Sequence, residues 1–391
     1  MNNAYIIGYK RTATGSYLGG LSNFSATALG TITIKALLED LDLPPEAIEN
    51  VYLGNVLSAG LGQSPARQAA IGAGIPYTTD ATTINKVCAS GMKALNLAAG
   101  EIELGQYDMA IAGGMESMSN APHYTHIRTG HKMGNTPLVD GLLLDGLTDA
   151  YKGYHMGNAA ETTVREFKLT REEQDNYALR SYELAAKAQD SGVFKNEIVP
   201  ITYTTRKGEI TIDKDEDITK LILEKVPQLK PSFEKDGTIT AANASNLNDG
   251  AASFILSSQK GIEKYKLKPL AKIIATADGA QNPASFSTSP AIAIKTLLEK
   301  AQLKIEDINC FEINEAYSSV VLANARILNL PIDKINQYGG AVAIGHPIGA
   351  SGARITGSLI TTLKNKNLKY GIAAICNGGG GATAILIENI F

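Results

Sequence analysis

Short apolar runs alternate along the chain with stretches in which apolar positions recur every three or four residues. Residues 5–8, 50–53 and 108–112 are short aliphatic runs, the pattern of buried β-strands. Residues 25–41 and 89–104 carry apolar side chains at the spacing of an amphipathic helix. The first part of the chain is therefore predicted to alternate strands with helices.

The last part of the chain repeats this alternation. It predicts, in order, a strand at 270–275, a helix at 290–301, a strand at 310–313, helices at 315–329 and 350–364, and strands at 371–375 and 382–388. This order is typical of an α/β fold. The segments YDMAIAGGMES (107–117) and YGIAAICNGGG (370–380) resemble each other, which favours two related halves.

The middle of the chain, from about 120 to 243, is polar and rich in loops, and it holds four of the five histidines: His123, His126, His131 and His155. A metal site formed by the first three is one interpretation. However, no cysteine or acidic ligand stands at zinc spacing beside them. Histidines at a surface or an interface are therefore the favoured interpretation, and no metal is expected.

Length and charge exclude several classes of protein. The chain has 391 residues and a net charge of −3; this length suggests two or three domains, because cores rarely grow beyond ~250–300 residues. Its charges form no basic stripe for nucleic acid, and no apolar run reaches the roughly 18–20 residues of a membrane span. Three cysteines are too few for a disulfide framework, so a cytoplasmic location is expected. A matrix protein whose presequence had been removed would look the same.

Cys88 lies in the segment NKVCASGMKA, between an apolar–polar run and a helix rich in small residues. A thiol at a helix N-terminus is close to the positive end of the helix dipole and to free N–H groups, which favour the thiolate. A catalytic nucleophile is the functional interpretation. A buried structural cysteine is the alternative.

Two further segments place a reactive side chain among glycines. His346 lies in GGAVAIGHPIGASGAR, where glycine and proline allow close approach and hold the imidazole rigidly; a core histidine is the alternative. Cys376 ends an apolar run, and the four glycines after Asn377 can aim N–H groups at a developing negative charge; a flexible turn is the alternative. Because the two cysteines lie far apart in sequence, acyl transfer coupled to deprotonation of a carbon acid fits better than a CxxC redox pair.

Four motifs together resemble the thiolase family: N-x-V-C-A-S-G-M-K around Cys88, NEAY at 314–317, GHPIGASGAR around His346, and CNGGGG at Cys376. The segments RTATGSYLGGL, GGMESMS, GYHMGNAAE and NASNLNDGAA extend the resemblance over nearly the whole chain in the family's order. The short length, the YHMG segment and the HYTHIRTGHKMG loop are most similar to acetoacetyl-CoA thiolases.

This resemblance implies acetyl-CoA C-acetyltransferase activity, in which two acetyl-CoA are in equilibrium with acetoacetyl-CoA and CoA through an S-acyl cysteine. A degradative 3-oxoacyl-CoA thiolase of broader chain length is the nearest alternative. A binding protein without turnover is another, although the intact reactive residues argue against it. Coenzyme A would be a substrate and product, with no further cofactor.

The resemblance also implies an architecture. The thiolase fold has two related α/β halves in a layered αβαβα core, with a loop domain inserted in the first half. The corresponding boundaries here are 1–118 for the N-terminal half, 119–243 for the loop domain, 244–267 for the return to that half, and 268–391 for the C-terminal half. A homotetramer is implied as well, with a tetramerisation loop at 123–134.

Family roles fall on matching positions of this chain. Cys88 would take the acyl group with His346 as its activator, and Cys376 would remove the α-proton of the second acetyl-CoA. One oxyanion hole would combine His346 with a water held by Asn314, and the other would use the N–H groups of Cys88 and Gly378. The residues expected to bind CoA and substrate are Leu147, His155, Met156, Phe233, Ser245, Ala316 and Tyr317.

Several positions depart from the family pattern. Tyr317 stands where phenylalanine is usual, Asn246 replaces a common glycine, and Ser287 after Phe286 leaves cleavage of 2-methyl-branched substrates unsupported. The TAANAS run resembles potassium-activated members. The tyrosine that helps to hold potassium in them aligns near Ile218, so potassium dependence is the less favoured alternative.

Overall fold

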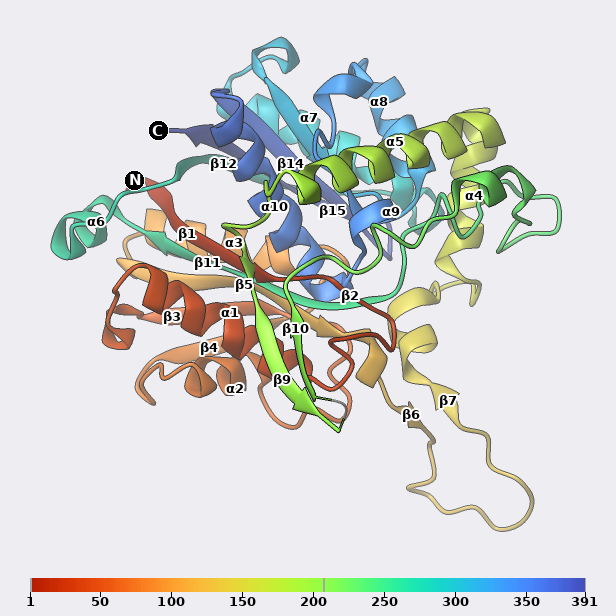
Figure 1. Cartoon of the computed structure of the whole chain (residues 1–391), viewed down its shortest axis with the longest axis horizontal. Helices are drawn as coiled ribbons and strands as arrows, with labels where there is room; N and C mark the ends of the chain where they lie inside the picture. Colours follow the sequence, from red (N-terminus) through yellow and green to blue (C-terminus); the bar gives the residue numbers. More distant parts are fainter. Residues whose placement is uncertain (1, 207, 391) are drawn as a thin grey trace.

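The computed structural model describes residues 2–206 and 208–390 and has a mixed β-sheet at its centre (Figure 1). Its strands run in the order β13 (Cys310–Ile313), β14 (Tyr370–Asn377), β15 (Gly381–Asn389), β12 (Ala271–Ala280), β1 (Ala4–Thr12), β11 (Asn248–Ser257), β5 (Met109–Ser117), β3 (Asn50–Gly54) and β4 (Asp80–Ile84). The short strands β2 (Gly15–Ser16) and β8 (Ile198–Val199) pair with β11 and β1. Within the described residues, three residue pairs join β1 to β12. This short contact marks the boundary between the two halves of the sheet.

The two halves of the sheet have the same pattern of strand directions. In the N-terminal half β1 is antiparallel to β11, β11 is antiparallel to β5, and β5 is parallel to β3. In the C-terminal half β12, β15, β14 and β13 repeat these relations in the same order. The similar segments 107–117 and 370–380 fall on β5 and β14, which occupy equivalent places. The predicted relation between the two halves is therefore confirmed.

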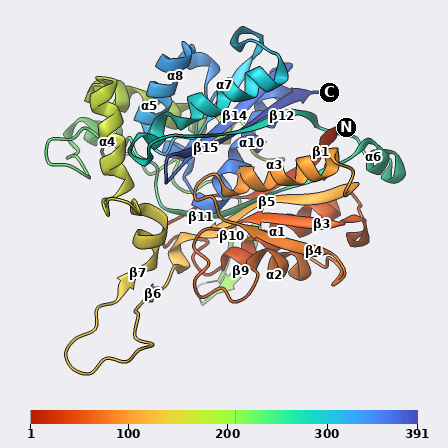
Figure 2. The same cartoon turned by 180° about the vertical axis from the view of Figure 1, so that it is seen from behind.

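Helices cover both halves of the sheet and fill the space between them (Figures 1 and 2). Helices α1 (Ala26–Asp40) and α2 (Pro65–Gly72) lie on the outer side of the N-terminal half, and α7 (Ser289–Ala301) and α8 (Ser318–Leu328) on that of the C-terminal half. Helices α3 (Ser90–Glu103) and α10 (Ile348–Asn365) pack on each other and contact strands of both halves. This is the predicted αβαβα layering.

The composition of α10 explains its central position. Every residue from Ile348 to Ile360 is buried, and most of them are small or aliphatic. A helix without a polar face is stable only where protein surrounds it on all sides. The helix therefore lies between the two halves, and its N-terminus reaches the interface between them.

The middle of the chain contributes fewer residues to the sheet. It supplies α4 (Met156–Glu166), α5 (Arg171–Asp190), the strand pair β6 (His123–Tyr124) with β7 (Val139–Asp140), and the hairpin of β9 (Ile201–Thr205) with β10 (Gly208–Ile212). The loop between β6 and β7 projects from the body of the protein (Figures 1 and 2). Two short helices, α6 (Gln259–Tyr265) and α9 (Ala341–Ile344), follow later in the chain. The proposed domain boundaries stay predictions.

Strand β11 and the start of helix α8 differ from what the apolar pattern indicates. Strand β11 is fully buried in the N-terminal half, although its first residues, Asn-Asp-Gly, are typical of a turn and predict no strand. The helix predicted at 315–329 begins only at Ser318, because Tyr317 has an extended backbone. Within the described ranges 2–206 and 208–390, no helix is long and apolar enough to cross a membrane.

A buried ion cluster joins the middle of the chain to the sheet. Arg11 in β1 is 2% exposed and donates to Glu197 at 2.7 Å and to both oxygens of Asp215 at 2.7 and 2.9 Å. Glu197 also accepts a hydrogen bond from Thr361 of α10 at 2.7 Å. One guanidinium of the sheet therefore binds two carboxylates that lie 186 and 204 residues further along the chain.

Arg11→Met is expected to lower the free energy of unfolding by roughly 3–5 kcal/mol, because it leaves two carboxylates buried without a counter-charge. The measurement is chemical denaturation of both proteins. Lys35→Met is the control, since Lys35 forms an exposed pair with Glu39 that contributes at most about 1 kcal/mol. Equal losses in the two variants would contradict a structural role for the Arg11 cluster.

Candidate active site

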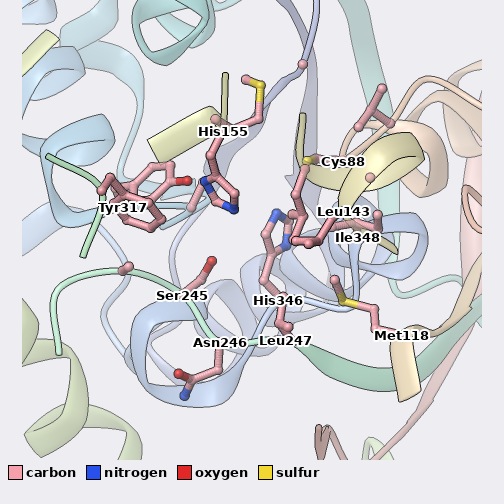
Figure 3. A pocket seen from close by; sticks show the side chains of 18 of the residues that line it. Cys88, Met118, Leu143, His155, Ser245, Asn246, Leu247, Tyr317, His346 and Ile348 are labelled. Atoms are coloured by element: carbon pink, nitrogen blue, oxygen red, sulfur yellow. The ribbon is translucent and has the colours of Figure 1, made fainter. Parts of the chain in front are cut away.

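A cavity of about 340 Å³ opens beside the N-termini of α3 and α10 (Figure 3). All the predicted site residues except Asn314 and Cys376 line it. Those residues are Cys88, Leu147, His155, Met156, Phe233, Ser245, Ala316, Tyr317, His346 and Gly378. In Figure 3, Cys88 and His346 lie toward one side of the cavity and Tyr317 toward the other. Residues from both halves and from the middle of the chain therefore meet at one cavity.

Cys88 lies in a tight turn between β4 and α3, which is the predicted strand–turn–helix placement. Val87 has a φ of +48°, a left-handed conformation that is unfavourable for a β-branched residue. The hydroxyl of Ser90 holds this turn, because it accepts from the Lys86 N–H at 2.8 Å and donates to the Val87 carbonyl. The strained turn presents the thiol to the cavity.

The thiol of Cys88 is protonated at rest, contrary to the expectation of a thiolate at a helix N-terminus. Burial raises its pKa to about 12. The backbone N–H groups of Cys88 and Gly378 donate hydrogen bonds to the sulfur and act in the opposite direction, but the loss of hydration is the larger effect. These two N–H groups come from the two different halves of the chain and converge on one atom.

His346 lies in the loop between α9 and α10. Gly345 before it has a φ of +111°, and a side chain there would collide with Asn248. Asn248 in turn accepts a hydrogen bond from the His346 backbone N–H at 2.8 Å. Behind the loop, the carboxylate of Glu116 accepts from the Gly349 N–H at 2.8 Å. The histidine loop is therefore fixed to strands β11 and β5.

The hydrogen bonds around the imidazole define its tautomer. The hydroxyl of Ser351 donates to the Pro347 carbonyl at 2.9 Å, so its oxygen accepts the proton on Nδ1 of His346 at 2.6 Å. Nε2 then carries a lone pair, and it has no hydrogen-bond partner in the described part of the chain. Burial, with a smaller contribution from the charge of Arg354, lowers the pKa of His346 to about 3. The imidazole is therefore neutral, with Nε2 available as a base.

Cys376 and Asn314 are the two predicted site residues that do not line the cavity. Cys376 is fully buried near the end of β14, and burial raises its pKa well above the ordinary value. Asn314 directly follows β13 and is 1% exposed. Among residues 2–206 and 208–390, neither its amide oxygen nor its amide nitrogen has a partner. Such an amide is suited to hold a water or a ligand atom.

Aromatic side chains form another part of the cavity lining. His155 caps α4, and its Nδ1 accepts from the Gly157 N–H at 3.0 Å. Its ring stacks on Phe233 with centroids 4.7 Å apart, and Phe233 meets Tyr317 edge-on at 5.9 Å. Burial lowers the pKa of His155, so this ring remains uncharged in a largely apolar surface.

Several residues that line or support the cavity were not predicted as site residues. Met118, Leu143, Leu247 and Ile348 line the cavity as well. Met118, Leu247 and Ile348 lie within motifs quoted above, which was a usable signal, whereas Leu143 lies outside every quoted motif. The supporting contacts of Asn248, Ser351 and Glu116 depend on partners distant in space or on side-chain direction, and no local pattern identifies them.

The histidines of the middle segment do not gather into a site with acidic or thiol ligands. His123 and His131 are exposed, and both belong to the segment that includes the projecting loop. In the ranges that the structure describes, no three His, Cys, Asp or Glu side chains are grouped so that they could hold a metal ion.

Comparison with known proteins gives a consistent result over the whole chain. The family model for the thiolase N-terminal domain matches residues 4–260, and that for the thiolase C-terminal domain matches residues 267–389. A cytosolic acetyl-CoA acetyltransferase of Gibberella zeae is 49% identical over 99% of this chain and 98% of its own. A mitochondrial acetyl-CoA acetyltransferase of Rattus norvegicus is 48% identical over 100% of this chain and 92% of its own.

Solved structures agree with these sequence matches. The Acat5 thiolase from Ascaris suum, crystallised in complex with coenzyme A, superposes with a TM-score of 0.94 at 44% identity and covers 99% of this chain and 100% of its own.

Proposed function

The chain belongs to the thiolase family and is an acetyl-CoA C-acetyltransferase, and we propose that Cys88, His346 and Cys376 carry its two half-reactions. The observation that carries this proposal is the environment of the Cys88 sulfur. Two N–H groups from different halves of the chain converge on it, and a neutral imidazole with a free Nε2 faces the same cavity. A nucleophile, a base and an oxyanion site are thereby assembled together.

In the first half-reaction the Cys88 sulfur attacks the thioester carbonyl of acetyl-CoA while Nε2 of His346 takes the thiol proton. The N–H groups of Cys88 and Gly378 donate to the oxyanion that forms. Its collapse breaks the carbon–sulfur bond to CoA, and the departing CoA thiolate takes a proton from Cys376. S-acetyl-Cys88, an imidazolium and a Cys376 thiolate remain, so protons and charge balance.

In the second half-reaction the Cys376 thiolate removes a methyl proton from a second acetyl-CoA. Its high pKa makes this thiolate a strong base once it has formed. The enolate oxygen accepts from Nε2–H of His346 and from a water held by Asn314. The enolate carbon then attacks the acetyl group, and Cys88 leaves with the proton of His346. Acetoacetyl-CoA is formed and each residue returns to its first state.

The cavity lining suits the pantetheine arm of CoA. Leu147, Met156 and Phe233 supply apolar contacts, while Ser245 and His155 offer polar atoms at the same surface. The coenzyme A bound in the Ascaris suum thiolase supports the same use of this cavity.

Assembly, ions and location form a further part of the proposal. We infer a homotetramer that uses the loop at 123–134, where Ile127 and Met133 are 50% and 89% exposed. We also infer a reaction without potassium, since Ile218 is buried in an apolar cluster and offers no oxygen ligand. The three free cysteines favour a reducing location such as the cytoplasm.

A degradative thiolase of broader chain length is the competing proposal, and substrate profiling separates the two. The expected result is faster CoA-dependent thiolysis of acetoacetyl-CoA than of 3-oxoacyl-CoA substrates with medium or long chains. Cys88→Ala should reduce every rate by roughly 10⁴–10⁶-fold, because the nucleophile is lost. Equal or faster thiolysis of long chains would assign the protein to fatty-acid breakdown, and wild-type inactivity on all of them would refute the catalytic proposal.

Ser351→Ala should lower kcat for thiolysis about 10–100-fold. It removes the acceptor for Nδ1–H of His346, and a hydrogen bond to a charged group contributes roughly 1.5–3 kcal/mol when the imidazolium forms. The matched control is Thr356→Val, which removes a similar bond from Thr356 to the Gly352 carbonyl on the same helix. An effect of Ser351→Ala no larger than that of the control would exclude this orienting role.

The acetylation of Cys88 by acetyl-CoA should change less than about threefold between pH 5.5 and 8.5. His346, with its pKa lowered to about 3, is neutral throughout this range, and Cys88, with its pKa raised to about 12, stays protonated. The reactive pair is thus fully populated at every pH of the series. The measurement is the burst of CoA released on mixing. A tenfold loss per unit below pH 6.5 would instead indicate a thiolate–imidazolium pair.

A further inference from the structure

A lysine close to the nucleophile connects the two halves of the site. Lys86, two residues before Cys88, extends its ammonium to strands of the C-terminal half. It donates to Asp278 at 2.6 Å, to the Thr383 hydroxyl at 2.8 Å and to the Ala382 carbonyl at 3.1 Å. These three acceptors use all three N–H bonds of the ammonium.

One of the two strands that Lys86 contacts is β15, and β15 is paired with β14, the strand that carries Cys376. Ala382 in β15 is the register partner of Cys376 in β14, and Gly381 is the partner of Asn377. Gly378 follows directly at the end of this pair of strands. The ammonium is therefore bonded to the hairpin that carries the Gly378 N–H.

The Cys88 turn needs an external support. Val87 holds a left-handed backbone conformation, which persists in a β-branched residue only where surrounding contacts impose it. The Ser90 hydroxyl supports the turn from its own helix, whereas the Lys86 side chain connects the turn to the opposite half.

We propose that Lys86 is a positioning residue that sets the separation of the Cys88 and Gly378 N–H groups in the acyl oxyanion hole. The inference rests on the proposed function, because that hole serves the acylation of Cys88. Displacements of about 1 Å at a reacting centre can slow catalysis ~100-fold. Partly exposed ion pairs, by contrast, contribute little to overall stability. Loss of Lys86 is therefore expected to affect the chemistry more than the fold.

Lys93 provides the matched control. It donates to the other oxygen of Asp278 at 2.6 Å, and its side chain is 29% exposed, against 25% for Lys86. It lies on α3, and the bond that its ammonium makes is to Asp278 of β12. Lys93→Met removes the same charge from the same carboxylate but leaves the turn and the hairpin connected.

The first measurement is the rate of Cys88 acetylation by acetyl-CoA in Lys86→Met and Lys93→Met. Lys86→Met is expected to slow acetylation by ~30–100-fold, and Lys93→Met by less than threefold. Lys86→Arg should also be slow, because a planar guanidinium cannot reproduce the three contacts of an ammonium. Equal slowing by both methionine variants, or full activity of Lys86→Arg, would overturn the inference.

A second measurement separates positioning from a general loss of structure. Exchange of the acetyl-CoA methyl protons with D₂O depends on Cys376 and the other oxyanion hole, so it is followed in a Cys88→Ala background. There the free Nε2 of His346 takes the thiol proton of Cys376, and the resulting thiolate removes the methyl proton. Adding Lys86→Met to that background should change exchange less than threefold. Slowing of exchange to the same extent as acetylation would mean a structural role only. Absence of acetylation in the wild-type enzyme would instead refute the proposed function.

Discussion

The close approach of α10 to the N-terminal half is the constraint on which the site depends. The carbonyl oxygen of Gly349 lies where side chains at Gly54, Gly91 and Gly114 would meet it at 2.7, 2.9 and 2.1 Å. Those are contacts with backbone, which cannot swing aside, so a larger residue would separate the halves. Because α3 and α10 meet through these glycines, the turn before one helix and the histidine loop before the other reach the same cavity. The catalytic geometry therefore depends on this close packing of main chain on main chain.

That packing also determines the electrostatics of the cavity. A dry environment raises the pKa of both site cysteines and lowers that of His346, so the resting site holds neutral groups instead of an ion pair. Charge is created only during the reaction, and the donors that stabilise it are already in place: two backbone N–H groups, an imidazole and a buried amide. Fixed donors in a site of low polarity stabilise such charge more effectively than mobile water does.

Much of the fold and of the site could be predicted from the sequence, because the information that determines them is local. Aliphatic runs and helical spacing predicted most strands of the central sheet and the helices α1, α3, α7 and α10 that pack on it. The four motifs contain all five residues predicted to be catalytic. What could not be predicted depends on distant partners. Strand β11 begins like a turn and becomes a strand only between its neighbours. The helix-terminus argument for a Cys88 thiolate left out burial, which no local pattern reveals and which raises the pKa of this thiol. The contacts of Ser351 and Lys86 depend on side-chain direction and on partners that only the folded chain brings near.

The neutral state of Cys88 has a consequence outside the catalytic cycle. Peroxides and low-molecular-weight disulfides react with thiolates, and a protonated thiol is a poor target for them. A site that ionises its sulfur only as a thioester arrives leaves little for an oxidant to attack between turnovers. The same desolvation that demands a base for acyl transfer thus lowers the reactivity of the resting Cys88 thiol toward such oxidants.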